Sequence, residues 1–261
     1  MEVHHSHGHH GPKKVKEYLV EFFMLFLAVS LGFLAENIRE SSIERHRSHD
    51  LAVALRTDVE ADILKMKSVI DSREEILAAA KYTVYDVEQH GFQRSDIKQY
   101  RNMLRAAYYW LYFEPRTANL DQIINSGSLR YFRSAELINS ISNYKNSILL
   151  LETRNEREKQ YFNDVMQPLV LKHMNLAPMD TTHFTSGMLS KDFFHKIDSG
   201  LITLHTKDLI LFDNSPEVKF EVVNAFRSFS INLTNSLRNS NKPYMKEAEH
   251  LVELLNKEIE E

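Results

Sequence analysis

The sequence predicts an all-α protein, with an N-terminal transmembrane helix continuous with a long stalk helix, followed by an antiparallel helical bundle. Glycine and proline are scarce, with seven and six in 261 residues, whereas a β-sandwich would need many turns. An apolar run occupies residues 18–35. Beyond it, apolar residues recur at steps of three and four, which is the period of a helix that buries one face.

The apolar run from Tyr18 to Ala35 contains one charged residue, Glu21. At about 1.5 Å per residue, the run spans roughly 27 Å, which is enough for a thin hydrocarbon core. Residues 22–35 carry no charge, so a helix there has no polar face to present to water. These observations favour a retained membrane helix over a buried core helix.

A cleaved signal peptide is the second alternative to a membrane anchor. Lys13, Lys14 and Lys16 form a basic start, and residues 28–30 contain the small side chains that a cleavage site needs. However, the apolar run continues through Leu34, and helix-favouring sequence follows without a break. The pattern therefore favours an anchor that stays attached.

The orientation of the anchor depends on the basic residues that flank it. The three lysines precede the span, and Arg39, Arg45 and Arg47 follow it, so the basic residues are nearly balanced. Because the lysines are closer together and closer to the span, we expect a short cytoplasmic N-terminus. The large C-terminal domain is then outside the cytoplasm.

Three residues of the anchor are candidate contacts with another membrane helix. Glu21 is either a carboxylate at the headgroup level or an intramembrane carboxylate that meets a partner subunit. Ala28 and Gly32 are four residues apart, a spacing of small side chains that lets two helices approach closely.

Residues 1–17 form a histidine-rich tail. Five imidazoles fall within its first ten residues: His4, His5, His7, His9 and His10. Neutral imidazoles at this density can bind zinc, nickel or copper, so they are candidate metal ligands. The alternative is a polar tail with adventitious metal affinity, because no packed neighbour fixes a coordination geometry.

Residues 36–261 are predicted to form a helical soluble domain, with a stalk helix over 36–90 and a bundle over 94–261. In the stalk, the apolar face consists of Leu55, Val59, Ile63, Met66 and Ile70. Gly91 is expected to end this helix.

The bundle begins with an aromatic-rich helix over 95–113, which Pro115 ends. Asn119 and Gln122 resemble a capping box for a short helix. Ser134 can begin a long helix towards Pro168, in which the charge run 152–159 is expected to be solvated. Two more helices follow, one starting at Ser215-Pro216 and one reaching Glu261, with a break predicted at residues 241–243.

The sequence contains no catalytic motif that we recognise. It has no glycine-rich phosphate loop, no Gly-x-Ser-x-Gly and no His-Glu-x-x-His, and the absence of cysteine excludes disulfides and thiolate sites. Only one acid-x-x-His pair, Glu247 and His250, lies on a confidently helical segment, whereas a di-iron bundle needs two such helices. We therefore expect no enzyme activity and no cofactor. A net charge of −4 argues against nucleic acid as a partner.

Two stretches resemble an uncharacterised family of bacterial single-span membrane proteins with a helical soluble domain. In the first, residues 21–37, an acid opens the span and Glu36-Asn37 forms a polar end. The second is similar to the family's Leu-x-x-Ser-Gly-x-Leu … Leu … Tyr core, here carried by Ile123, Ser126, Gly127, Leu129, Leu137 and Tyr144. The resemblance implies the same topology, in a bacterial inner membrane with the C-terminal domain in the periplasm. It implies no activity.

These features favour a membrane-anchored interaction or scaffold protein. The expected partners are the lipid membrane and either a second copy of the chain or another protein. An extracytoplasmic ligand sensor or a metal-handling protein is the alternative.

Overall fold

The computed structural model describes residues 15–107, 110–177, 195–196, 199–201 and 207–260. Within these residues the protein is all-α, as predicted, and the only extended pairing is an isolated bridge between Met174 and Ile210. The chain divides into two compact units, Met1–Leu51 and Ala52–Glu261.

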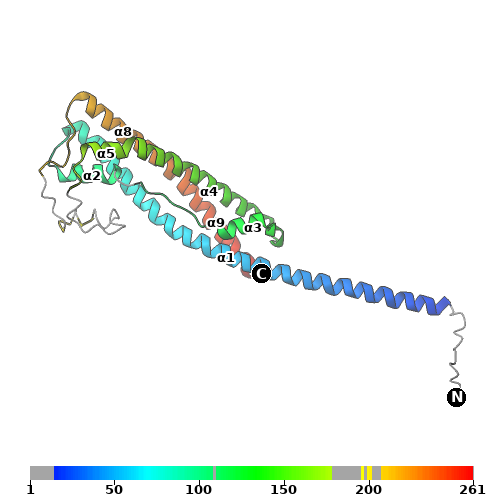
Figure 1. Cartoon of the computed structure of the whole chain (residues 1–261). Helices are drawn as coiled ribbons and strands as arrows, with labels where there is room; N and C mark the ends of the chain where they lie inside the picture. The colour runs from blue at the N-terminus through cyan, green and yellow to red at the C-terminus, as the bar shows by residue number, and fades with distance from the viewer. Residues whose placement is uncertain (1–14, 108–109, 178–194, 197–198, 202–206, 261) are drawn as a thin grey trace, which may run out of the picture. The chain divides into compact units, whose positions relative to one another are not determined.

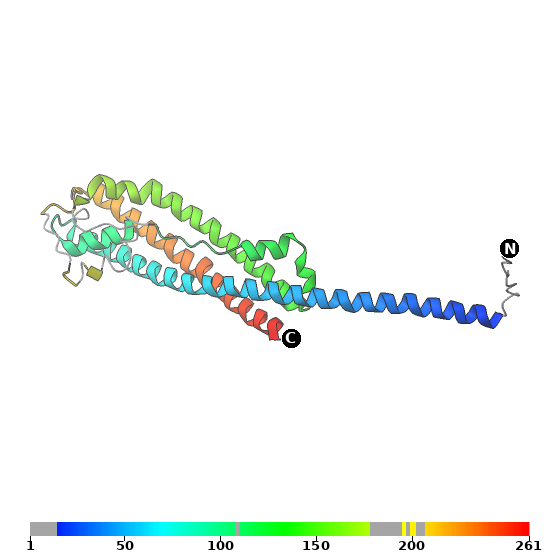
Figure 2. The same ribbon diagram turned by 60° about the horizontal axis from the view of Figure 1, so that its bottom comes forward.

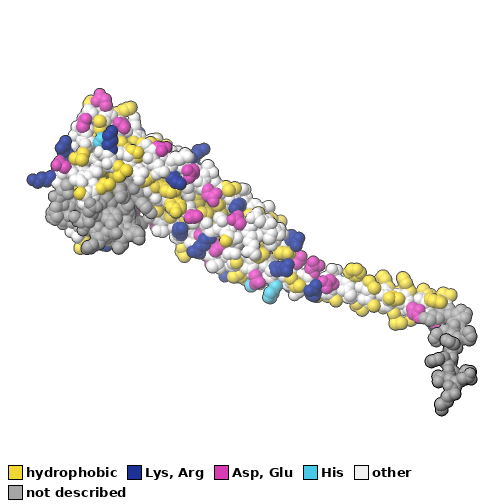
Figure 3. Space-filling model, viewed as in Figure 1, with side chains coloured by type: hydrophobic (Ala, Val, Ile, Leu, Met, Phe, Trp, Pro, Cys, Tyr) yellow, Lys and Arg dark blue, Asp and Glu magenta, His cyan; other side chains and the backbone are white. Residues whose placement is uncertain are grey.

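The first helix, α1, spans Val15–His90 and contains both the predicted anchor and the predicted stalk. Its N-terminal part is the one stretch among the described residues that is long and apolar enough to cross a membrane. None of this apolar window is buried, and Phe33, for example, is 70% exposed. Exposed hydrophobic side chains cover this part of α1, and charged side chains come next along the helix (Figure 3). The buried-core alternative has no support in this arrangement.

In the second unit, α1 from Ala52 onwards is a wall of the bundle, so this part of the expected stalk is a packed helix. Leu55, Val59 and Met66 are fully buried on its inner face, as the spacing predicted. Gly91 ends the helix at a positive φ of 69°, and its N–H donates to the Val87 carbonyl at 2.9 Å.

The predicted helix over 95–113 is too long. Helix α2 spans only Ile97–Ala107, and the chain from Trp110 to Thr117 is an extended segment, which we call the strap. Side chains from α1 and α4 bind three of its backbone polar groups. Asp62 accepts from the Arg116 N–H at 2.7 Å, and Asn155 donates to the Phe113 carbonyl at 2.9 Å. These bonds replace the hydrogen bonds that a helix would have supplied.

The strap leads into a short helix, α3, over Ala118–Asn125, and a 3-10 turn, η1, over Ser128–Tyr131. The predicted capping box at Asn119 is wrong, because the N-cap is Thr117 and its side chain forms no capping bond. The amide of Asn119 donates to Asp58 on α1 instead, at 2.7 Å. The side chain therefore anchors the end of the strap.

Helix α4 spans Ala135–Tyr161, and the Ser134 hydroxyl caps it by accepting from the Leu137 N–H at 3.1 Å, as predicted. Its Glu158 meets Arg73 of α1 at 2.9 Å, and the orange and red C-terminal helices run between the ribbons of α4 and α1 (Figures 1 and 2). Helices α1 and α4 run in the same direction. Burial, together with the charges of Asp62 and Asp58 early in the bundle part of α1, raises the pKa of Tyr144. Arg73, later in α1, forms its ion pair with Glu158, later in α4. This is possible because the strap carries the chain back along α1 before α4 begins.

Helices α8, over Pro216–Ser236, and α9, over Lys242–Glu260, run antiparallel to both α1 and α4. Ion pairs trace this direction along α1, from Glu88–Arg227 at 2.6 Å to Lys67–Glu249 at 3.7 Å. The Ser215 cap of α8 and the burial of Ala248, Leu251 and Leu255 on α9 are as predicted. Ile259 at the end of the predicted face is only partly buried.

The predicted break at residues 241–243 is wrong, because α8 continues into α9 through a π-helical segment, η3, over Leu237–Asn241. A second π segment, η2, over Phe162–Met166, joins α4 to α5, which spans Gln167–His173. Each π segment ends two residues before a proline, Pro168 or Pro243. Proline lacks the N–H of an α-helical bond and clashes with the carbonyl four residues earlier. A wider turn at this position lets the helix continue past the proline.

A pH measurement tests how Asp62 holds the strap. Burial raises the pKa of Asp62, against the opposing effect of the Arg116 N–H and guanidinium. The folded state therefore binds this proton at a higher pH than the unfolded chain, so its contribution to stability grows as the pH falls through the folded pKa. We expect the melting temperature of the wild type to rise relative to that of Asp62→Asn as the pH is lowered from about 7 to about 4.

The asparagine oxygen can still accept from the Arg116 N–H, so this variant removes the titration and keeps the hydrogen bond. The measurement is made on the full chain in detergent at each pH. A difference between the two proteins that stays constant, or that grows in favour of the variant at low pH, would contradict the assignment.

Candidate functional site: a groove between α5 and α8

The predicted helix-contact residues lie on the exposed N-terminal part of α1. Glu21, Ala28 and Gly32 are all exposed, and a Cβ added to Gly32 would meet nothing within 4 Å. The surface around Gly32 is therefore open to a second helix. The histidines of the tail, His4, His5, His7, His9 and His10, lie outside the described residues.

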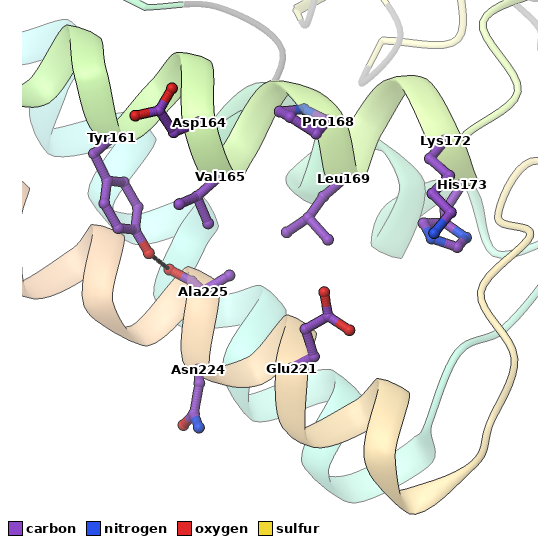
Figure 4. Close-up of a pocket in the computed structure, with 10 residues that line it drawn as sticks. All are labelled: Tyr161, Asp164, Val165, Pro168, Leu169, Lys172, His173, Glu221, Asn224 and Ala225. Carbon is purple, nitrogen blue, oxygen red and sulfur yellow. Dashed lines mark hydrogen bonds between the residues drawn. The ribbon is translucent and has the colours of Figure 1, made fainter.

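The second unit contains a groove of about 510 Å³ between η2 and α5 on one side and α8 on the other (Figure 4). Val165 and Leu169 point across the groove towards α8, where Ala225 faces them. The Tyr161 hydroxyl donates to the Ala225 carbonyl at 2.9 Å. This bond closes one end of an apolar floor.

Charged side chains surround this floor. The lining includes Asp164, Lys172 and Glu221, together with His173 at the end of α5. The His173 ring stacks on Phe212, with 4.4 Å between the ring centroids. Burial and the neighbouring Lys172 lower the pKa of His173, against the effect of Glu221. His173 is therefore neutral at neutral pH and forms a flat wall of the groove.

One wall of the groove follows from local sequence. Tyr161, Val165, Leu169 and His173 recur every four residues, which places them along one face of the helix. The π turn η2 lies within this row, so the row continues along the groove across Pro168. Apolar side chains between charged ones give a surface that can bind an apolar group flanked by polar ones.

A buried polar network lies along the same helices, centred on Arg73 of α1, which is 1% exposed. Its guanidinium forms an ion pair with Glu158 of α4 at 2.9 Å and donates to Asn241 at 2.9 Å. It also donates to Asn155 at 3.2 Å and to the Leu111 carbonyl of the strap at 2.9 Å. One side chain therefore joins α1, the strap, α4 and η3.

Burial dominates the electrostatics of this network. It raises the pKa of Glu158, whereas the positive charge of Arg73 opposes the shift. Glu158 is 7% exposed and lies within the predicted solvated charge run 152–159, so that prediction is wrong at this residue. With Arg73 and Glu158 both buried, the contacts of the network join helices to one another.

Among the described residues, no group of three or more His, Asp or Glu side chains could hold a metal ion. The chain matches no family model, no curated protein and no solved structure. The resemblance drawn from residues 21–37 and from the Ile123–Tyr144 pattern stays a prediction.

Sequence reasoning missed Arg73 and Glu158, although a signal was present. In α4, buried residues recur at steps of three and four: Leu137, Ile141, Tyr144, Ile148 and Leu151. Continuing the same steps reaches Asn155 and then Glu158. A charged residue at a core position of a helical stripe predicts a buried partner of opposite charge.

A double-mutant cycle tests the network. Arg73→Met leaves the Glu158 carboxylate buried without its counter-charge, so we expect a loss of about 3–5 kcal/mol in the free energy of unfolding. Arg73→Met combined with Glu158→Leu removes both charges, and we expect it to recover most of this loss. Denaturant unfolding of the full chain in detergent micelles measures both values.

The exposed pair Glu253–Lys257, with its atoms 2.9 Å apart, is the matched control. Because water screens this pair, Lys257→Met is expected to change the free energy of unfolding far less than Arg73→Met does. If Arg73→Met costs no more than Lys257→Met, or if the double variant is as unstable as the single one, Arg73 is not the centre of the packing.

Proposed function

We propose that this chain is a membrane-anchored helical interaction or scaffold protein, placed in a bacterial inner membrane with its C-terminal domain in the periplasm. The observation that carries the proposal is the complete exposure of the apolar window of α1. A contiguous apolar surface of this size is unfavourable in water and needs lipid or protein to cover it. The same helix continues into the bundle, so covering the window with lipid anchors the bundle to the membrane.

The groove between α5 and α8 supports the interaction part of the proposal. A binding surface with an apolar centre and a charged rim is the usual pattern of a protein interface. Val165 and Leu169 provide the apolar centre, and Asp164, Lys172 and Glu221 provide the rim. We propose that a protein partner, or a second copy of the chain, binds at this groove.

Site-specific photo-cross-linking in native membranes tests the proposal. A photoreactive amino acid at Leu169 is expected to capture one defined partner band. The same amino acid at Leu149, which is 50% exposed on α4, is the matched control and should capture none. Ala225→Glu places a charge in the apolar floor and is expected to abolish the Leu169 product. A chain that purifies as a monomer and gives equal products at both positions would contradict the scaffold function.

Two further measurements test the membrane part separately. The full chain should stay with the membrane after an alkaline wash, whereas a variant lacking residues 18–35 should be released. A reporter fused after Glu261 should be active only outside the cytoplasm. Activity of the reporter only in the cytoplasm would reverse the orientation.

An extracytoplasmic ligand sensor is the second candidate function, since the groove volume of about 510 Å³ lies within the range of small-molecule sites. A metal-handling role rests on the histidine tail alone. Bound metal that survives deletion of residues 1–11 would require a site elsewhere in the chain.

A further inference from the structure

A second hollow, separate from the groove described above, lies between α1 and α8. This basic slot has a volume of about 370 Å³ and is lined by Lys81, Val84, Arg227, Ser230, Ile231, Thr234 and Asn235. Its volume is near the lower end of the range for small-molecule sites. It therefore suits a slender ligand rather than a large one.

The floor of the basic slot is more apolar than its residue types suggest. Ser230 donates its hydroxyl to the Phe226 carbonyl at 2.8 Å, and Thr234 donates to the Ser230 carbonyl at 2.7 Å. Both hydroxyls are thus satisfied by the backbone of α8 and are not needed by a ligand. The carbon atoms of Ser230 and Thr234, together with Val84 and Ile231, are left to contact a ligand. Ile231 is 56% exposed, so a ligand can still bury apolar surface there.

Every ionisable side chain that lines the slot is cationic. Arg227 is paired with Glu88 at 2.6 Å, which offsets its charge. Lys81 forms no ion pair with any residue that the structure describes, and it projects from the facing helix. The Asn235 amide lines the slot as a further hydrogen-bond donor. A ligand that matches this arrangement has an anionic head and an apolar body.

We propose that the basic slot binds a single-chain amphiphile with a carboxylate head, its chain along Val84 and Ile231 and its carboxylate at Lys81. The carboxylate gains a charge-assisted hydrogen bond from the ammonium group, and the chain leaves water. The groove between α5 and α8 has acids as well as a lysine on its rim and lacks this one-sided charge. The proposal is independent of the interaction function.

Photoaffinity labelling of the full chain in phosphatidylcholine nanodiscs tests this proposal. The probe is a fatty acid that carries a diazirine on its chain, and mass spectrometry locates the label. We expect labelling on the α1 and α8 residues that line the slot. Decanoate should compete for the site at least about tenfold better than decylamine, whose head has the wrong charge. Label found only in the anchor, or equal competition by the two compounds, would overturn the proposal.

Two variants separate the apolar and the electrostatic parts. Ile231→Glu fills the slot with a charge and should reduce labelling by more than about tenfold, while the control Leu149→Glu on α4 should not change it. Lys81→Met should weaken competition by decanoate about fivefold, as expected for an exposed ion pair, and leave decanol unaffected. Circular dichroism confirms that each variant is folded. Labelling that is unchanged in Ile231→Glu, or weaker competition by decanol as well as decanoate in Lys81→Met, would contradict the site. Binding of an acidic amphipathic peptide in place of decanoate would also contradict it and assign the slot to a protein.

Discussion

The buried guanidinium of Arg73 is the interaction on which the bundle depends. A charge removed from water costs several kcal/mol unless opposite charge and hydrogen bonds surround it. Here Glu158 supplies the charge, and Asn155, Asn241 and the Leu111 carbonyl accept hydrogen bonds from the two terminal nitrogens, while Nε is buried without a hydrogen-bond partner. These partners come from three separate segments of the chain, the strap, α4 and η3. Each segment must therefore be in place before the charge is compensated, which couples the packing of α1, the strap, α4 and η3.

The strap explains why α1 and α4 run in the same direction. Parallel neighbours need a connection that returns along the helix, and here α2, the strap and α3 share that return. They meet α1 at Asp86, then at Arg73 and Asp62, and finally at Asp58. An extended segment covers more length per residue than a helix does, about 3.3 Å against about 1.5 Å. It also exposes its backbone groups, and Asp62 and Asn155 then bind two of them. The buried polar side chains on α1 and α4 are thus required by the topology.

The sequence allowed the helical class, the continuity of the membrane helix with the stalk, the Ser134 and Ser215 caps and the Gly91 terminus to be predicted. These features depend on local periodicity and capping chemistry, which a single sequence records. The strap was missed because its aromatic residues satisfy a helical pattern, and the contacts that keep it extended come from distant residues. The continuation through Pro243 was missed for another reason. A proline usually ends a helix, and only packing on both sides of η3 makes a π turn more favourable than a break.

The groove between α5 and α8 could not be predicted, because its two walls are 56 residues apart in sequence, at Leu169 and Ala225. The candidate residues that were predicted, Glu21, Ala28 and Gly32, concern the anchor and lie in the other compact unit. Local signals identified where the chain needs a lipid or protein partner. They carried no information on which helices would pack together. A groove forms only where two helices pack, so its residues could not be identified from local signals.

Polar residues in the helical seams also set the register of the bundle. On α1, core positions recur at steps of three and four, and three of them are charged, Asp62, Arg73 and Asp86. An apolar seam of this kind could slide by one heptad with little change in burial. Sliding would remove Arg73 from Glu158, and it would remove Asp62 from Tyr244, whose ring lies against Tyr144 with the hydroxyls 2.8 Å apart. Each shift leaves a charge buried without a partner. The two polar layers therefore select one register from several that hydrophobic burial alone would permit.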